Sequence, residues 1–207
     1  MTPLFPRDDV AITLSQGKTG DCYLLAALDC VFNLGKEGRD AIKSLFTETD
    51  DGVIVRIKRS KQSAFLKPEK MKGKYEYFHD TITDEDVFKI STEKLGEIDK
   101  TTIGAQTNSL AVKILERISS YYYVSDWNND GILASVLAHN IALRHSDTST
   151  TFVGTLLGID AYDTRDLDQI IKLKTINPQL PVYISMSYGK PDIFGKFHGR
   201  HALRVER

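Results

Sequence analysis

The chain has 207 residues, 27 basic and 28 acidic side chains and 41% hydrophobic residues, a composition typical of globular proteins. Because the charges balance, the chain has no overall positive potential that would attract nucleic acid. No apolar run reaches the roughly 18 residues of a membrane-spanning helix. Arg7, Asp8 and Asp9 interrupt the stretch where a signal peptide needs an apolar core. Only two cysteines are present, so we expect no disulfide framework and a cytoplasmic or other reducing compartment.

The first part of the chain predicts two helices. Apolar residues cover most of the helical circumference over 22–34, which indicates a deeply buried helix. Asp21 has the residue type of an N-cap, and Gly35 that of a C-terminal stop. A second helix is predicted over 37–46, where Ile42, Leu45 and Phe46 share a face.

The middle of the chain is more mixed. Residues 52–60 alternate like a half-buried strand, and 74–79 suggest another paired strand. Short helices are predicted around 84–89 and 93–97. A clear amphipathic helix is predicted over 109–123, with Leu110, Ile114, Leu115 and Ile118 facing inward, and another over 130–142.

The last third changes in texture. Residues 151–159, 180–188 and 201–207 alternate like strands, with a helix at 167–173, and the last two strands predict a hairpin. We therefore expect an α+β fold in one domain spanning 1–207. Lobe 1, about 1–145, would be mainly helical, and lobe 2, about 146–207, mainly antiparallel β.

The strongest chemical signal is Cys22, which follows a glycine-containing turn at the start of the buried helix. The N–H groups and dipole of a first helical turn favour a thiolate, which is a strong nucleophile for acyl transfer. Gln16 lies six residues earlier, so the turn can bring its side-chain amide beside the Cys22 N–H. These two donors would stabilise a tetrahedral oxyanion. Cys30, in the middle of the helix, is expected to serve packing.

A thiol nucleophile also needs a base. His201 begins the last predicted strand, and a strand holds an imidazole rigidly, so His201 is the best candidate. His198, three residues earlier, is the alternative base. The two histidines lack a credible third ligand for zinc, so no metal site is predicted.

Residues 16–27 (QGKTGDCYLLAA) closely resemble the active-site segment of calpain-type cysteine proteases, which reads Q-G-x-x-G-D-C-W-x-L-A-A. Tyr23 stands where the family has tryptophan. Residues 110–122 are similar to a helix of the same family. His201-Ala202 resembles the segment of the catalytic histidine, with Arg200 and Leu203 replacing a glycine and a tyrosine.

This resemblance implies a papain-like two-lobed fold, with a central cysteine-bearing helix in the helical N-terminal lobe and an antiparallel β C-terminal lobe. It implies a cysteine endopeptidase acting on protein or peptide substrates. Cys22 would be the nucleophile, His201 the base and Gln16 part of the oxyanion hole. Calpains depend on calcium, but the resemblance locates no calcium site in this chain, and no other cofactor is expected.

The family's third catalytic residue is an asparagine downstream of the histidine. This chain ends six residues after His201 without a matching residue, and Asn177-Pro178 lies upstream. We therefore keep three alternatives: a truncated protease core, another group that orients His201, or an inactive protein.

Two other functions keep the same fold. The Cys–His pair would also serve a deamidase, a transglutaminase or another acyl transferase, and the domain would otherwise be a pseudoprotease or protein-binding module. Residues 126–131 match the start of an EF-hand loop, but Leu137 occupies the position of its bidentate glutamate. The acidic patches 48–51 and 84–86 would suit calcium, although they are more typical of solvated surface, and calcium is left open. The Lys-rich stretch 58–74 is also typical of solvated surface, but it would suit an acidic partner as well. The sequence leaves the oligomeric state open.

Overall fold

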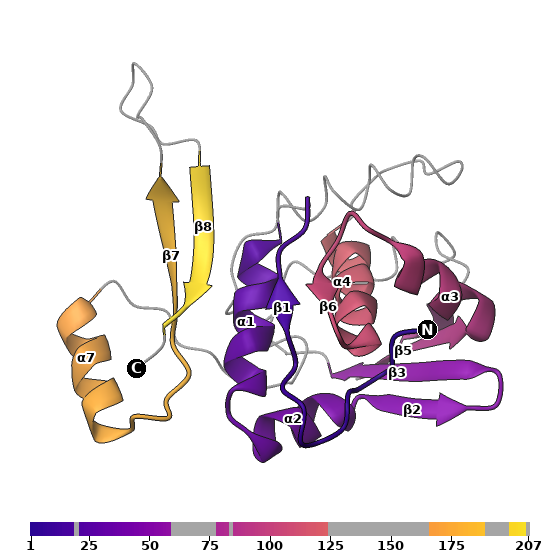
Figure 1. Ribbon diagram of the computed structural model, residues 1–207, viewed down its shortest axis with the longest axis horizontal. Helices are drawn as coiled ribbons and strands as arrows, with labels where there is room; N and C mark the ends of the chain where they lie inside the picture. The colour runs from indigo at the N-terminus through magenta and orange to yellow at the C-terminus, as the bar shows by residue number, and fades with distance from the viewer. Residues whose placement is uncertain (19–20, 59–77, 83–84, 124–165, 189–198, 206–207) are drawn as a thin grey trace.

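The computed structural model describes residues 1–18, 21–58, 78–82, 85–123, 166–188 and 199–205 (Figure 1). Within these ranges the fold is α+β, as predicted, with helices packed against small antiparallel sheets. The described part of the first 145 residues contains a four-stranded sheet as well as helices.

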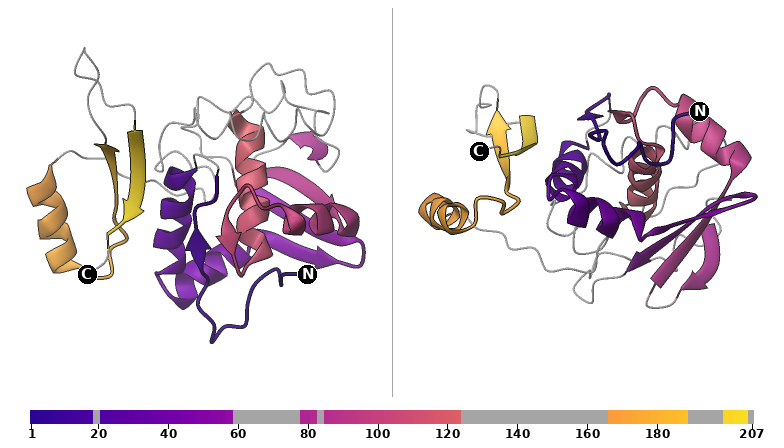
Figure 2. Two further views of the ribbon diagram at one scale, coloured as in Figure 1. Left: turned by 45° about the horizontal axis from the view of Figure 1, so that its top comes forward. Right: turned by 60° about the horizontal axis from the view of Figure 1, so that its bottom comes forward.

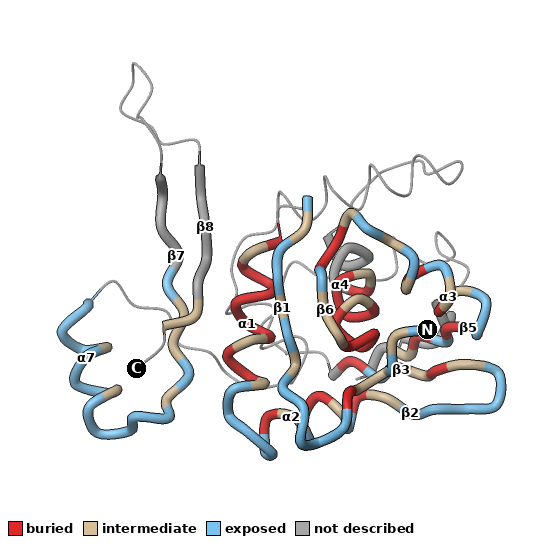
Figure 3. The backbone as a smooth tube through the Cα atoms, viewed as in Figure 1, coloured by how far each residue is buried: buried red, intermediate tan, exposed pale blue. Residues whose placement is uncertain are grey.

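Helix α1 (Cys22–Phe32) confirms the predicted buried helix. Eight of its residues are buried: Tyr23, Leu24, Leu25, Ala26, Ala27, Leu28, Cys30 and Val31. α4 (Leu110–Tyr123) contributes to the same hydrophobic core. It confirms the predicted amphipathic helix and buries Leu110, Ile114, Leu115 and Ile118. Figure 3 shows the buried residues concentrated along these two helices. α1 is apolar around its circumference because it has packing partners on more than one side.

The core is closed by a sheet with the strand order β2-β3-β5-β4. Its strands are β2 (Phe46–Thr49), β3 (Gly52–Lys58), β4 (Phe78–Ile82) and β5 (Glu85–Ser91). β3 confirms the predicted strand. The short helix predicted around 84–89 was wrong, because Phe88 and Ile90 are buried on either side of the exposed Lys89, the period-two pattern of a strand. β5 pairs with β3 along its whole length, and this long-range pairing outweighs local helical preference.

The second predicted helix is shorter than expected. α2 (Lys36–Lys43) ends before Phe46, which begins β2 and pairs with Val55. Phe46 therefore belongs to the sheet and not to the predicted helix, because it pairs with Val55 of β3. α1 ends with Asn33 as its C-cap, and Gly35 (φ 73°) has the left-handed backbone that favours glycine and opens α2. The predicted helix 93–97 lies within α3 (Thr92–Lys100), which Ser91 caps.

The C-terminal part confirms the predicted hairpin. β7 (Tyr183–Tyr188) pairs antiparallel with β8 (Gly199–Arg204), with Tyr183 opposite Arg204. α7 (Leu167–Ile176) extends beyond the predicted 167–173 and buries none of its residues among those described. Figures 1 and 2 show the hairpin lying along α1, with α7 on the hairpin's far side. The predictions for 130–142 and 151–159 lie outside the described residues.

The N-terminal segment crosses the core and ends at the start of α1. Ser109 Oγ donates to the Leu4 carbonyl at 2.7 Å, and β1 (Leu14–Ser15) pairs with β6 (Gln106–Thr107). This pairing brings the turn that follows β1 next to the segment that precedes β6. Across the described part of the chain, no helix is both long and apolar enough to cross a membrane.

Candidate active site

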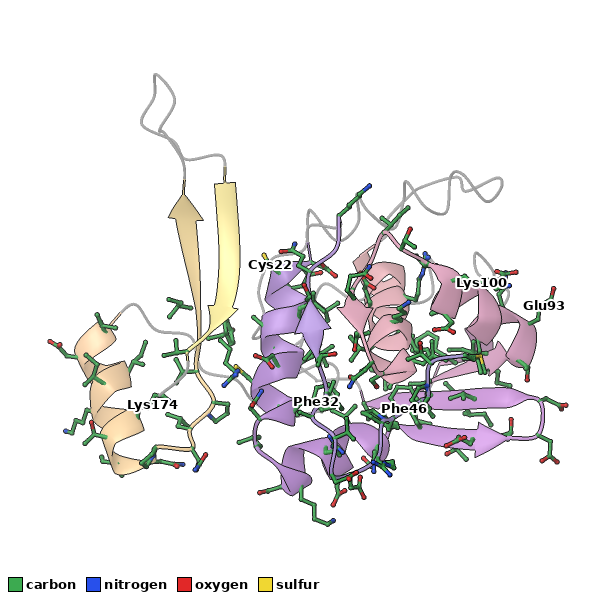
Figure 4. All side chains as sticks on the ribbon, viewed as in Figure 1. Cys22, Phe32, Phe46, Glu93, Lys100 and Lys174 are labelled. Carbon is green, nitrogen blue, oxygen red and sulfur yellow. The ribbon has the colours of Figure 1, made fainter. Side chains whose placement is uncertain are left out.

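Cys22 is the first residue of α1, at the upper end of that helix in Figure 4. The helical hydrogen bonds begin with Leu24 and Leu25, whose N–H groups donate to the Asp21 carbonyl at 2.9 and 3.1 Å. The N–H of Cys22 therefore has no acceptor within the helix and is available for an anion. The Cys22 side chain is half-buried and packs against the edge of the core.

The turn that carries Gln16 rests on residues 103–104. Lys18 N–H donates to the Ile103 carbonyl at 2.8 Å. A Cβ atom on Gly17 would lie 2.5 Å from the Ile103 oxygen and still closer to the Gly104 oxygen, so only glycine fits there. Gln16 is exposed, and its side-chain amide lies close enough to the Asp21 carboxyl to favour the ionised form by hydrogen bonding.

Asp21 occupies the N-cap position, as predicted, but its side chain caps no N–H group. Its backbone (φ −111°, ψ 22°) lacks the extended conformation that aims an N-cap side chain at the helix. The residue is fully buried, and neither carboxyl oxygen has a hydrogen-bond partner of good geometry among the described residues. Burial first, and then the neighbouring Glu116, raises the pKa of Asp21 to about 9. Burial and the Glu116 carboxyl thus favour the protonated form of Asp21, beside Cys22.

Glu116 is a feature that the sequence analysis missed. It belongs to α4 and is only 3% exposed. Its two carboxyl oxygens lie 3.1 and 3.3 Å from the Ala105 nitrogen, which donates to them. A signal was present, because Glu116 lies four residues after the buried Val112 and so shares a helix face with it.

His201 lies in β8, opposite Met186 of β7. β8 runs beside α1 in the same direction, and Arg204 Nε donates to Asp29 Oδ2 of α1 at 2.5 Å (Figure 1). Seven helical residues separate Asp29 from Cys22, a rise of about 10 Å, and three strand residues separate Arg204 from His201, also about 10 Å. The His201 backbone is thus level with Cys22 along the helix. The His201 side chain and the whole of His198 lie outside what the structure describes.

The two cysteines of α1 differ in environment. Cys30 is 5% exposed, in agreement with its expected packing role. Burial raises the pKa of its thiol to about 12, with a smaller contribution from the charge of Asp29. At neutral pH Cys30 is therefore a protonated thiol.

Asn177, half of the chain's Asn-Pro pair, has a local structural role. It is the exposed C-cap of α7. Its Oδ1 accepts from the Gln179 N–H at 3.1 Å, and its carbonyl accepts from the Leu180 N–H at 2.9 Å. These bonds stabilise the turn into β7.

The described residues do not fit a calcium site. No group of three His, Cys, Asp or Glu side chains within them is arranged to hold a metal ion. Glu48, Asp50 and Asp51 are exposed at the β2–β3 turn. The segment 126–131, Asp84 and the Lys-rich residues 59–74 lie outside the described ranges.

Comparison of the chain with protein-family models, curated proteins and solved structures finds no match. Its function must therefore be inferred from its own residues. Among these, the structure brings together Gln16, Asp21 and Cys22 at one end of α1, with Glu116 against the segment beneath the Gln16 turn.

Proposed function

We propose that the protein is a calpain-type cysteine protease core, which hydrolyses peptide bonds with Cys22 as nucleophile and His201 as base. The observation that carries the proposal is the half-buried Cys22 at the first position of a buried helix, with the Gln16 amide close to the preceding residue. A helix N-terminus favours an anion at this position, and the neutral Asp21 does not oppose it.

In the proposed acylation step, the His201 imidazole accepts the Cys22 thiol proton. The sulfur then attacks the carbonyl carbon of a peptide, and the carbonyl π electrons move to the oxygen. The Gln16 amide and the Cys22 N–H donate to this oxyanion. As the tetrahedral intermediate collapses, the imidazolium gives its proton to the amide nitrogen. The C–N bond breaks, the amine product leaves, and a thioester remains on Cys22.

Water completes the proposed cycle. His201 removes a proton from water, and the resulting hydroxide attacks the thioester carbonyl. The C–S bond breaks, the carboxylic acid leaves, and the thiolate of Cys22 is restored beside the imidazolium. The same two oxyanion donors serve both steps, so their alignment affects acylation and deacylation alike.

We also propose that this α+β fold has the two-lobed arrangement of papain-like proteases. In this arrangement α1 is the central helix of the first lobe, and the β7–β8 hairpin belongs to the second lobe. The Arg204–Asp29 contact supports it, because it attaches the second lobe's strand to the first lobe's helix at a fixed level. Substrate would bind between the two.

The test is turnover of an unfolded protein substrate by the full chain and by Cys22→Ser, His201→Ala and His198→Ala. We expect new peptide termini with the parent protein and losses of at least about 1,000-fold for Cys22→Ser and His201→Ala. His198→Ala is the matched control and should remain within about tenfold of the parent. A base at His198 would reverse the two histidine results.

Mass spectrometry of the same reactions separates the alternatives. Deamidated or cross-linked glutamine side chains without new termini would replace hydrolysis by acyl transfer on the same site. A folded chain that neither turns over substrate nor reacts with a thiol-directed activity probe would contradict both enzymatic functions and favour the protein-binding module.

A further inference from the structure

We propose that Glu116 is a positioning residue, which holds the Gln16–Lys18 turn in place through residues Ile103–Ala105 and thereby aligns the Gln16 amide. This inference rests on the proposed function for the role of Gln16, but the link from Glu116 to the turn stands on its own contacts. It connects a side chain in the middle of α4 with the start of α1.

The first link joins Glu116 to the segment before β6. Both carboxyl oxygens lie within 3.3 Å of the Ala105 nitrogen, whose N–H they accept. Gly104 is packed so closely on the carboxyl that a Cβ there would lie 2.6 Å from Glu116 Oε1. The carboxyl therefore fixes the distance of the backbone at residues 104–105 from α4. A larger residue at position 104 would push this backbone away from the carboxyl.

The second link joins that segment to the turn. The Ile103 carbonyl accepts the Lys18 N–H at 2.8 Å, and Gly17 lies in close contact with Ile103 and Gly104. The antiparallel pairing of β1 with β6 holds the same two chain segments together directly next to this contact. A shift of Gly104 would thus be passed directly to the turn that presents Gln16.

The choice of a carboxyl at this buried position also points to a positioning role. A buried ionisable group lowers stability unless hydrogen bonds offset its desolvation, and an apolar side chain would fill the same space at lower cost. Glu116 also lies beside the buried Asp21, which directly precedes Cys22. The carboxyl therefore contacts the surroundings of both the turn and the nucleophile without reaching the reacting atoms.

The kinetic test compares Glu116→Ala and Glu116→Gln with the full parent chain. Alkylation of Cys22 by iodoacetamide needs the nucleophile but no oxyanion, whereas peptide turnover needs both. We expect Glu116→Ala to lower kcat about tenfold or more, while the KM and the alkylation rate stay within about twofold. Glu116→Gln keeps an acceptor for the Ala105 N–H and should restore most of the kcat.

Ile118→Ala is the matched control, because it removes a buried side chain from the same helix and so lowers stability. It should leave the ratio of turnover to alkylation unchanged. If Glu116→Ala behaves like Ile118→Ala, or if Glu116→Gln fails to rescue, Glu116 has only a structural role and the inference is overturned.

Amide hydrogen exchange tests the link even if the parent chain proves inactive. In Glu116→Ala we expect the Lys18 N–H to exchange at least about tenfold faster relative to the Thr92 N–H, which bonds to Asp51 elsewhere in the fold. An unchanged Lys18 rate would contradict the positioning role. Inactivity of the parent with a changed Lys18 rate would instead contradict the proposed function alone.

Discussion

Each end of α1 carries a cysteine next to an aspartate, and the burial of the two side chains is reversed between the ends. At the N-terminal end, Cys22 is half-buried, and Asp21 is buried and protonated. Towards the C-terminal end, Cys30 is buried and protonated, and Asp29 is partly exposed and paired with Arg204. One helix thus carries a half-buried thiol beside a buried acid, and a buried thiol beside an ion-paired acid.

This difference shows that the environment of each cysteine and aspartate depends on its position on the helix and not on its residue type. The first turn provides N–H groups without intrahelical acceptors, which favour an anion, whereas the interior of the helix provides no such groups and buries the thiol of Cys30. The acid that could oppose the anion is neutralised by burial. Asp29, in contrast, is partly exposed and forms an ion pair with Arg204 of β8.

The largest expected effect is the selectivity of thiol alkylation. In the folded chain, iodoacetamide should modify Cys22 at least about 100-fold faster than Cys30, because burial keeps Cys30 protonated. Cys30 borders a polar cavity of about 390 Å³ between α1, Lys174 and Arg204. Because this cavity gives reagents a path to the thiol, slow alkylation of Cys30 would reflect its protonation and not only its limited access. Peptide mapping measures the two rates, and denaturant should abolish the difference. Faster modification of Cys30 would break the comparison and the assignment of the nucleophile.

The next effect is a pH-dependent gain of stability in Asp21→Asn. Asp21 keeps its proton up to about pH 9 when folded but loses it near its ordinary value of 3.8 when unfolded. Between these values the folded state binds more protons, so stability falls as pH rises. The variant lacks this loss, and its Tm should match that of the parent near pH 4 and exceed it by about 10 °C or more at pH 8.

Thermal unfolding monitored by circular dichroism at both pH values measures this difference. The control is Asp9→Asn, which changes an exposed carboxylate and should give parallel curves for variant and parent. An Asp21→Asn variant that is less stable than the parent at pH 8 would show that the buried carboxyl is ionised and useful to the fold.

The smallest effect is the loss of the pair at the other end of the helix. Because Arg204 and Asp29 are only 22% and 29% exposed, Arg204→Ala or Asp29→Ala should lower the free energy of unfolding by about 1–2 kcal/mol. A double-mutant cycle in urea should give a coupling of about 1 kcal/mol. The Arg7–Asp9 pair, with both side chains mostly exposed, should show less than about 0.5 kcal/mol. Equal coupling free energies for the two ion pairs would contradict the view that the Arg204–Asp29 contact holds β8 against α1.

Periodicity predicted the elements whose burial follows a single local pattern. α1, α4 and β3 are of this kind. The alternation of 180–188 and 201–207 also predicted the hairpin β7–β8. β5 and the end of α2 were predicted incorrectly, because strand pairing between distant segments decides both. The same division holds for the site. Cys22 and Gln16 stand in one short motif, whereas the burial of Asp21 against Glu116 joins residues far apart in the chain.

The sequence by itself determined a cysteine at the start of a buried helix, a glycine-containing turn before it and an antiparallel hairpin at the end. These follow from spacings of a few residues, where helix geometry and side-chain alternation apply directly. Only the tertiary structure decided that Asp21 is a buried neutral acid, that Glu116 contacts the segment under the Gln16 turn, and that Arg204 brings β8 level with α1. The physical reason is that desolvation and contact depend on which surfaces meet in three dimensions, and local sequence does not specify them.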